Sequence, residues 1–177
     1  GLNASTGSGE SMQADAGAVL VISGGTVTLD AEGDGLDSNG DALVSGGTVT
    51  VYGPTRSGNG ALDTNGTLLV TGGTLVAFDS GGMTQSPDAS SSQGWLTATA
   101  TGSAGETVQV TDASGTVVAE ATSRKDFGSV TYSSAAITSG ESYTVATTAD
   151  STTVTAGEGG QGGGPGGGPG GGGGRRP

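Results

Sequence analysis

The sequence predicts an all-β fold: a short parallel β-helix (a solenoid) capped by a small antiparallel β-sheet domain and followed by a disordered Gly-rich tail. The first observation is a phrase with Gly-Gly-Thr at its centre that occurs three times, at residues 22–29, 44–51 and 70–77. The second is its period, because 22 residues separate Gly24 from Gly46 and 26 separate Gly46 from Gly72. Strand-like runs at such a period, without a helical pattern, are typical of stacked repeats.

The copies of the phrase alternate apolar and polar residues, which predicts half-buried strands. The inward set of the first copy is Leu20, Ile22, Val27 and Leu29. Val49 and Leu75 take the position of Val27 in the next two copies, so we expect these three side chains to stack in one buried ladder. The glycine pair in each copy is expected to form a corner between two strands of one coil, because a tight bend favours a residue without a Cβ.

Four segments are expected along the chain. Residues 1–17 lack periodicity and are expected to be a flexible lead-in, and 18–94 hold the β-helix coils. Residues 95–154 are expected to form the C-terminal antiparallel cap, from strand-like runs at 95–101, 107–111, 116–121, 128–133 and 143–148. An open end of the coils would expose apolar side chains and unpaired strands, so a cap is physically expected. Residues 155–177, rich in Gly and Pro, are expected to be a disordered tail.

The composition narrows the functional classes. The 177 residues include 17 acidic and 5 basic side chains, a net charge of −12, which disfavours binding to the phosphates of nucleic acid. The chain has no Cys and no His, so thiolate sites and histidine catalysis are excluded. It has no apolar run of membrane-spanning length, so no membrane insertion is expected. It has no initiating Met and no signal peptide, so we expect a mature or trimmed segment, and one that is a covalent part of a longer cell-surface chain.

Acidic residues gather between the repeated phrases. Asp34 and Asp37 lie in 33–40, and Asn59 and Asp63 lie in the related segment 58–66. Stacking of the repeats would place Asp37 about 4.8 Å from Asp63, where two carboxylates repel. A bound calcium ion would relieve that repulsion through oxygen ligands. The alternative is that Asn39 and Asn65 form a structural ladder in tight turns and the acids are solvated.

Other chemistries fit the acidic stretch less well. Residues 30–41 place acids as in an EF-hand loop, but Asp41 stands where Glu is usual and the flanks are strand-like. The nine-residue calcium repeat of secreted toxins needs tandem copies, and one fragment fits. Asp34 and Asp37 could serve as the acid and base of a glycosidase, but nothing marks either as desolvated.

The outward threonines at 26–28 and 48–50 resemble an ice-binding array. The third copy interrupts that array, and Thr is also an ordinary strand residue.

Six phrases of this chain together resemble a known family. They are GlyAspGlyLeuAspSerAsnGly (33–40), SerGlyGlyThrValThrValTyrGlyPro (45–54), GlyAsnGlyAlaLeuAsp (58–63), GlyGlyThrLeuVal (72–76), SerGlyGlyMetThrGlnSerPro (80–87) and SerSerGln (91–93). They are similar to phrases of secreted bacterial carbohydrate-binding proteins built on a right-handed parallel β-helix of pectate-lyase shape. The resemblance covers roughly residues 18–150. It implies calcium between coils and binding of cellulose or acidic pectin without lyase activity.

The resemblance also implies site residues. Asp34, Asp37 and Asp63 would be metal ligands, with Asn59 beside them. Longer relatives have more coils than this chain, which bears on the length of any glycan groove. From the residues themselves, the weaker ligand-binding candidates are Tyr52, Arg56, Asn39, Asn65 and Trp95, and a core anchor is the alternative for Trp95.

The function expected from the sequence is therefore an extracellular, non-catalytic polysaccharide-binding module stabilised by calcium, either secreted or at the cell surface. The alternative is a structural or adhesive β-helical spacer of a cell-surface protein, with the glycine-rich tail as its stalk and no glycan activity.

Overall fold

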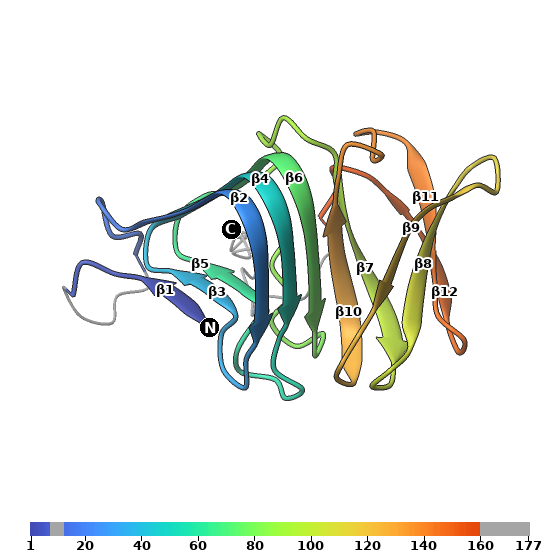
Figure 1. Cartoon of the computed structure of the whole chain (residues 1–177), viewed down its shortest axis with the longest axis horizontal. Helices are drawn as coiled ribbons and strands as arrows, with labels where there is room; N and C mark the ends of the chain where they lie inside the picture. Colours follow the sequence, from blue (N-terminus) through green and yellow to red (C-terminus); the bar gives the residue numbers. More distant parts are fainter. Residues whose placement is uncertain (8–12, 160–177) are drawn as a thin grey trace, which may run out of the picture.

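The structure, a computed structural model, describes residues 1–7 and 13–159, which form three β-sheets (Figure 1). The strands are β1 (Leu2–Ala4), β2 (Val19–Asp30), β3 (Leu36–Ser38), β4 (Asp41–Tyr52), β5 (Leu62–Thr64), β6 (Leu68–Asp79), β7 (Trp95–Gly102), β8 (Thr107–Asp112), β9 (Val117–Thr122), β10 (Phe127–Ser133), β11 (Ser142–Ala146) and β12 (Ser151–Thr155). The sheet orders are β1-β3-β5, β2-β4-β6-β10-β7 and β12-β11-β8-β9. The all-β class predicted from the sequence is confirmed.

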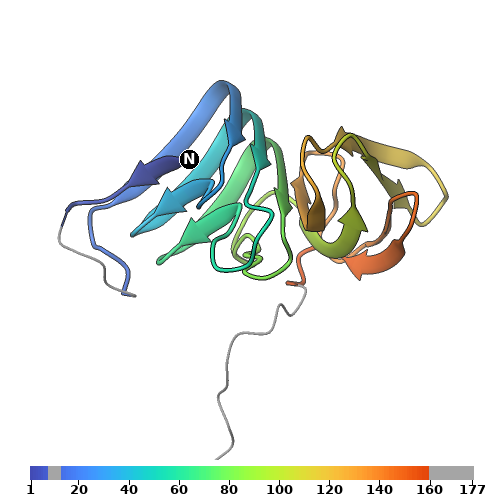
Figure 2. The same cartoon turned by 90° about the horizontal axis from the view of Figure 1, so that it is seen from below.

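The repeated phrases pair in parallel, one copy on the next. Val27 pairs with Val49, and Val49 pairs with Leu75, so the expected register is confirmed. Val49 and Leu75 are completely buried, whereas Val27 is half-buried because β2 is the outermost strand of its sheet. Figure 2 shows the long strands β2, β4 and β6 side by side, and the short strands β1, β3 and β5 as a second row next to them.

Each copy of the phrase forms one continuous strand of 12 residues, and not two strands joined at a corner. The glycine pair lies inside the strand, where the register shifts. Gly25, Gly47 and Gly73 have φ angles of 78°, 85° and 83°, a region that side-chain-bearing residues rarely adopt. The glycines therefore bend a strand without ending it.

The predicted β-helix with a separate cap is wrong, because the third parallel strand continues into an antiparallel sheet. Strand β10 pairs antiparallel with β6, from Ser129 opposite Asp79 to Ser133 opposite Leu75, and β7 pairs antiparallel with β10. The result is one mixed sheet of five strands, next to a parallel sheet of three strands and an antiparallel sheet of four. The segment predicted to be a cap supplies two strands of the central sheet.

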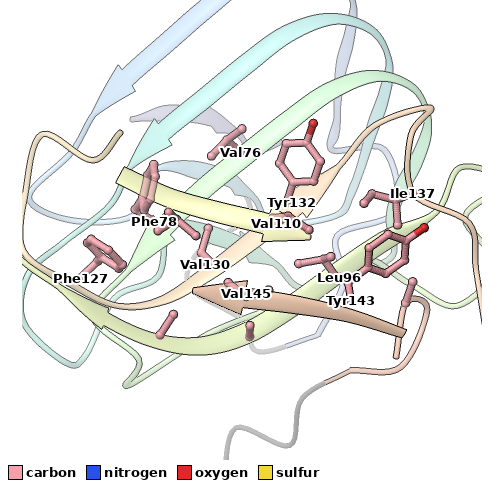
Figure 3. Close-up of a cluster of buried hydrophobic side chains, with 14 of the residues drawn as sticks. Val76, Phe78, Leu96, Val110, Phe127, Val130, Tyr132, Ile137, Tyr143 and Val145 are labelled. Atoms are coloured by element: carbon pink, nitrogen blue, oxygen red, sulfur yellow. The ribbon is translucent and has the colours of Figure 1, made fainter. Parts of the chain in front are cut away.

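The physical reason why β6 continues into antiparallel strands is the character of its outward face. Where the first copy has Thr28 and Asp30, the third has Val76 and Phe78, and both of these are buried. They join a hydrophobic cluster with residues of the antiparallel strands, among them Leu96, Val130 and Val145 (Figure 3). A second cluster joins the three-stranded sheet to the parallel strands of the five-stranded sheet and includes Leu36, Val44, Val49, Leu62 and Leu75.

The antiparallel strands agree closely with the runs expected from the sequence. The turn at 111–116 joins β8 to β9 as expected, with Oδ1 of Asp112 accepting from the amides of Ser114 (2.8 Å) and Thr116 (2.9 Å). Strand β12 was not predicted, and neither was β1, which lies in the expected lead-in. The expected tail lies, from residue 160 onward, outside the described residues.

Candidate functional site

The three-stranded parallel sheet aligns one polar residue from each strand. Asn3 of β1 pairs with Asp37 of β3, which pairs with Asp63 of β5. The residues before and after each aspartate are buried, so both aspartates lie on the outer face of the sheet, where they are half-buried. The expected stacking of Asp37 on Asp63 is confirmed. We call Asn3, Asp34, Asp37 and Asp63 the acidic row.

Hydrogen bonds hold the acidic row in place. The side-chain amide of Asn3 donates to Oδ2 of Asp37, which links β1 to β3. The backbone amide of Gly60 donates to Oδ1 of Asp34 at 2.9 Å, which links the segments before β3 and β5. Each repeat is therefore fastened to the next through a carboxylate.

The electrostatics of the acidic row centre on Asp63. Burial raises the pKa of the Asp63 carboxyl, and the negative charges of Asp34 and Asp37 raise it further. The charges of Asp34 and Asp37 therefore lie close enough to destabilise the charged form of Asp63. A cation beside them would reverse this effect.

The donor chemistry of the acidic row suits a hard cation such as calcium, which prefers carboxylate and amide oxygens. The described residues contain no group of three or more acidic, His or Cys side chains arranged to enclose a metal ion. A cation at the row would therefore need ligands beyond these side chains to complete its coordination. Asn59, the fourth predicted ligand, is half-buried and directly precedes Gly60, whose amide binds Asp34.

The two aromatic candidates face the interior of the protein. The Tyr52 ring stacks on Phe78 with centroids 5.8 Å apart and planes 6° from parallel, and the guanidinium of Arg124 lies 5.1 Å from its centroid. Tyr52 is 8 % exposed and Trp95 is 3 % exposed. Neither ring offers the open face that stacking on a sugar requires, and Trp95 has the environment of a core residue.

Two of the remaining candidates, Asn39 and Asn65, directly follow β3 and β5. The backbone amide of Asn39 donates to the carbonyl of Ala4 (2.9 Å), and that of Asn65 donates to the carbonyl of Ser38 (3.0 Å). These are backbone bonds that any residue other than proline could make, so the asparagine ladder stays a prediction. Arg56 is exposed in the segment between β4 and β5.

Two residues near the acidic row were missed in the sequence. Asp79 is 4 % exposed, and its Oδ2 accepts from the amide of Ala61 at 2.7 Å while Oδ1 accepts from Gly81 at 3.0 Å. Gln85 covers the outer edge of β5, since its Oε1 accepts from the amide of Thr64 (2.8 Å) and its Nε2 donates to the carbonyl (3.1 Å). The signal for Asp79 was its place at the end of an apolar run, directly before Ser-Gly-Gly.

A recess of about 460 Å³ lies away from the acidic row, on the four-stranded sheet, where Glu106, Gln109 and Thr148 are among its lining residues. Oε1 of Glu106 accepts from the backbone amide of Thr148 at 2.7 Å, and its Oε2 accepts from the amide of Ser103 at 2.9 Å. Hydrogen bonding from Thr148 and Ser103 lowers the pKa of Glu106. This carboxylate therefore holds two turns together and has no general-acid environment.

Comparison of the chain with protein-family models, with curated proteins and with solved structures gave no match. The carbohydrate-binding interpretation therefore depends on the phrases of the sequence and on the geometry of the acidic row. Within the described part of the chain, no helix has the length and apolar character needed to cross a membrane.

Proposed function

We propose that this protein is an extracellular, non-catalytic polysaccharide-binding module for cellulose or acidic pectin-type glycan, and that calcium at the acidic row stabilises it. The observation that carries the proposal is the register of Asp37 on Asp63 across β3 and β5, with the charge of Asp34 also acting on Asp63. Parallel pairing fixes these carboxylates next to one another before any ligand arrives, so binding needs little rearrangement.

Asp34, Asp37 and Asp63 would hold the cation, with Asn59 at the margin. Calcium would supply positive charge that offsets the repulsion among these carboxylates and attracts a ligand that carries carboxylates of its own. The protein has a net charge of −12, which by itself repels an acidic polysaccharide. Attachment to an acidic glycan is therefore expected to depend on calcium.

The outer face of the three-stranded sheet suits an extended, hydroxyl-rich chain. Asn3, Asp37 and Asp63 offer amide donors and carboxylate acceptors in a line across the strands. The aromatic rings of Tyr52 and Trp95 are buried, so polar contacts and the cation would have to supply the affinity. This arrangement favours the acidic pectin-type glycan over cellulose.

The test is a sedimentation assay on insoluble polygalacturonate and on cellulose, each with calcium and with a chelator. Wild-type protein is expected to bind polygalacturonate in calcium and to be released by the chelator. Asp37→Asn and Asp63→Asn should each weaken binding tenfold or more, on the scale of losing one charge-assisted contact. Asp150→Asn is the matched control, because Asp150 is an exposed acid in the turn before β12.

Equal binding by wild type and the two row variants would show that the glycan lies elsewhere. Failure to bind either polysaccharide, with or without calcium, would leave the structural or adhesive spacer as the function, in which the rigid parallel strands matter and the acidic row does not.

A further inference from the structure

The outer edge of β2 is a long strand edge with a single charged residue, Asp30. Among the described residues β2 pairs only with β4, and it is the first strand of its sheet. Val19 and Val21 on it are 52 % and 56 % exposed, and Leu2 on the neighbouring edge strand β1 is 40 % exposed. The strand contains no Lys or Pro, the residues that proteins commonly use to prevent edge pairing.

We propose that this edge binds a second copy of the same chain, with the two β2 strands antiparallel about a two-fold axis at Gly24–Gly25. In this arrangement residue 24 lies opposite residue 25 of the partner, and every pair of opposed residues has numbers that add to 49. The proposal follows from two properties of β2 that are symmetric about that point. One is which residues turn their side chains toward the core, and the other is which residues turn their backbone amide and carbonyl groups toward the open edge.

The side chains of β2 face the core in a palindromic order. Those turned toward the interior are Ala18, Leu20 and Ile22 before the glycines and Val27, Leu29 and Ala31 after them. The two-fold arrangement places Leu20 opposite Leu29, and Ile22 opposite Val27. Core-facing residues thus meet core-facing residues, so the hydrophobic interior would continue from one copy into the other.

The backbone groups match in the same register. The carbonyl of Ala18 accepts from Asp41, and the amide of Ala31 donates to Tyr52, so both alanines direct their backbone groups toward β4. In a parallel pair the residues alternate in the edge to which their backbone groups point. Residues 19 and 21 before the glycines, and 28 and 30 after them, therefore face the open edge. These are the residues that the two-fold arrangement sets opposite one another, for example Val21 and Thr28. Ser23 does not follow this alternation, because the register shifts there and its carbonyl is turned toward Gly46 of β4.

The charge of the β2 edge and the area that it would bury indicate a weak but specific dimer. Asp30 is the one acid in β2, and Lys125, which lies 2.7 Å from Asp30 and 2.9 Å from Glu32, offsets part of its charge, so this edge carries little charge on a chain of net charge −12. Twelve residues span about 40 Å, and a strip about 10 Å deep would bury roughly 400 Å² on each partner. A total near 800 Å² is below the roughly 1,000 Å² expected of a stable interface, so we expect a weak, transient dimer that forms at micromolar concentrations or above. Added salt should strengthen it by screening the net charges.

The experiment is sedimentation velocity of the full chain over a range of concentrations and salt. Wild type is expected to form a dimer as concentration rises, and Val21→Lys and Thr28→Pro to shift that transition tenfold or more upward. Thr28→Pro removes an amide that faces the open edge, where proline is tolerated. Val117→Lys is the control, because Val117 is 46 % exposed on β9, the edge strand of another sheet.

Disulfide trapping tests the register. The sequence has no cysteine, so Val21→Cys with Thr28→Cys should give a covalent dimer under oxidation, while each single variant should stay monomeric. A monomer at all concentrations, an assembly that grows beyond two copies, a dimer unchanged by Val21→Lys, or equal cross-linking of the single variants would each overturn the proposal.

Discussion

The ammonium nitrogen of Lys125 lies 2.7 Å from Oδ1 of Asp30, which joins the segment before β10 to the end of β2. The same nitrogen lies 2.9 Å from Oε1 of Glu32 and donates to the carbonyl of Ala31 at 2.8 Å. The first repeat is thereby fastened to the antiparallel strands although β4 and β6 separate them in the sheet.

Lys125→Met is expected to lower the free energy of unfolding by about 1–3 kcal/mol, the range for losing hydrogen bonds to a charged group. Most of the loss should come from the buried Ala31, because Asp30 and Glu32 are 52 % and 85 % exposed and such ion pairs contribute little. Urea denaturation measures the change. Arg124→Met, which removes the cation above Tyr52, is the comparison and should have an effect below about 1 kcal/mol. Equal losses would contradict this assignment.

The stability of the protein should also fall at alkaline pH. Burial lowers the pKa of Lys125, but hydrogen bonds and charges from Asp30 and Glu32 outweigh it and raise the pKa. A raised pKa in the folded state means that this stabilisation is complete below the unfolded lysine pKa of about 10.4 and is lost as pH rises through the folded value. Unfolding midpoints measured across the alkaline range should decline more steeply for wild type than for Lys125→Met. Parallel curves would exclude the effect.

Asp79→Ala should destabilise the protein by about 1–3 kcal/mol, because it leaves the buried amide of Ala61 without its acceptor. Asp79→Asn keeps an acceptor oxygen and should lose less. The control is Asp88→Ala, since Asp88 is exposed and accepts from Ser90 in a surface turn. Thermal and urea unfolding of the three variants test the order, and a larger loss at Asp88 would refute it.

Gly47→Ala and Gly25→Ala separate backbone strain from steric conflict. Both glycines have positive φ, at 85° and 78°, which disfavours alanine by about 1–2 kcal/mol. A Cβ at Gly47 would also lie 2.6 Å from the carbonyl oxygen of Gly25, whereas a Cβ at Gly25 meets nothing within 4 Å. Gly47→Ala should therefore be the more destabilising by at least about 1 kcal/mol in dilute solution. Equal effects would mean that the strands move apart at little cost.

Millimolar calcium is expected to raise the melting temperature, because a ligand that binds only the folded form stabilises it by about 2.7 kcal/mol at a hundredfold excess over Kd. Asp37→Asn and Asp63→Asn should remove that increment, and Asp150→Asn should keep it. Differential scanning calorimetry with calcium and with a chelator makes the comparison. Superimposed wild-type curves would show that the acidic row is a set of ordinary surface charges.

The repeat itself was predictable because its period fixes which residues lie opposite one another. Val27, Val49 and Leu75 align as the sequence indicates, and so do Asp37 and Asp63. Alternation also located the antiparallel strands to within one or two residues, apart from β12, which has a single apolar side chain, Val154.

The way in which the strands assemble was not predictable from the period. A repeat shows which copies of the phrase pair with one another. The partner of the last copy is instead set by contacts between segments far apart in the sequence, such as β6 with β10. A local sign was present, since Val76 and Phe78 replace the polar outward residues of the first copy. The burial of Tyr52 has the same cause in part: Phe78 stacks on its ring from the neighbouring parallel strand β6, whereas Arg124 reaches it from the segment between β9 and β10.

Strand β6 is covered along both edges, and this sets a gradient of protection against hydrogen exchange. On one edge it pairs with β4; on the other, its carbonyls at Leu68 and Val70 accept from Asp88 and Gln93, and its second half pairs with β10. Opening β6 requires breaking two ladders, whereas β2 opens by breaking one. Among the three parallel strands, amide protons should therefore persist longest in β6 and shortest in β2, so that this part of the sheet unfolds strand by strand from the β2 edge toward β6.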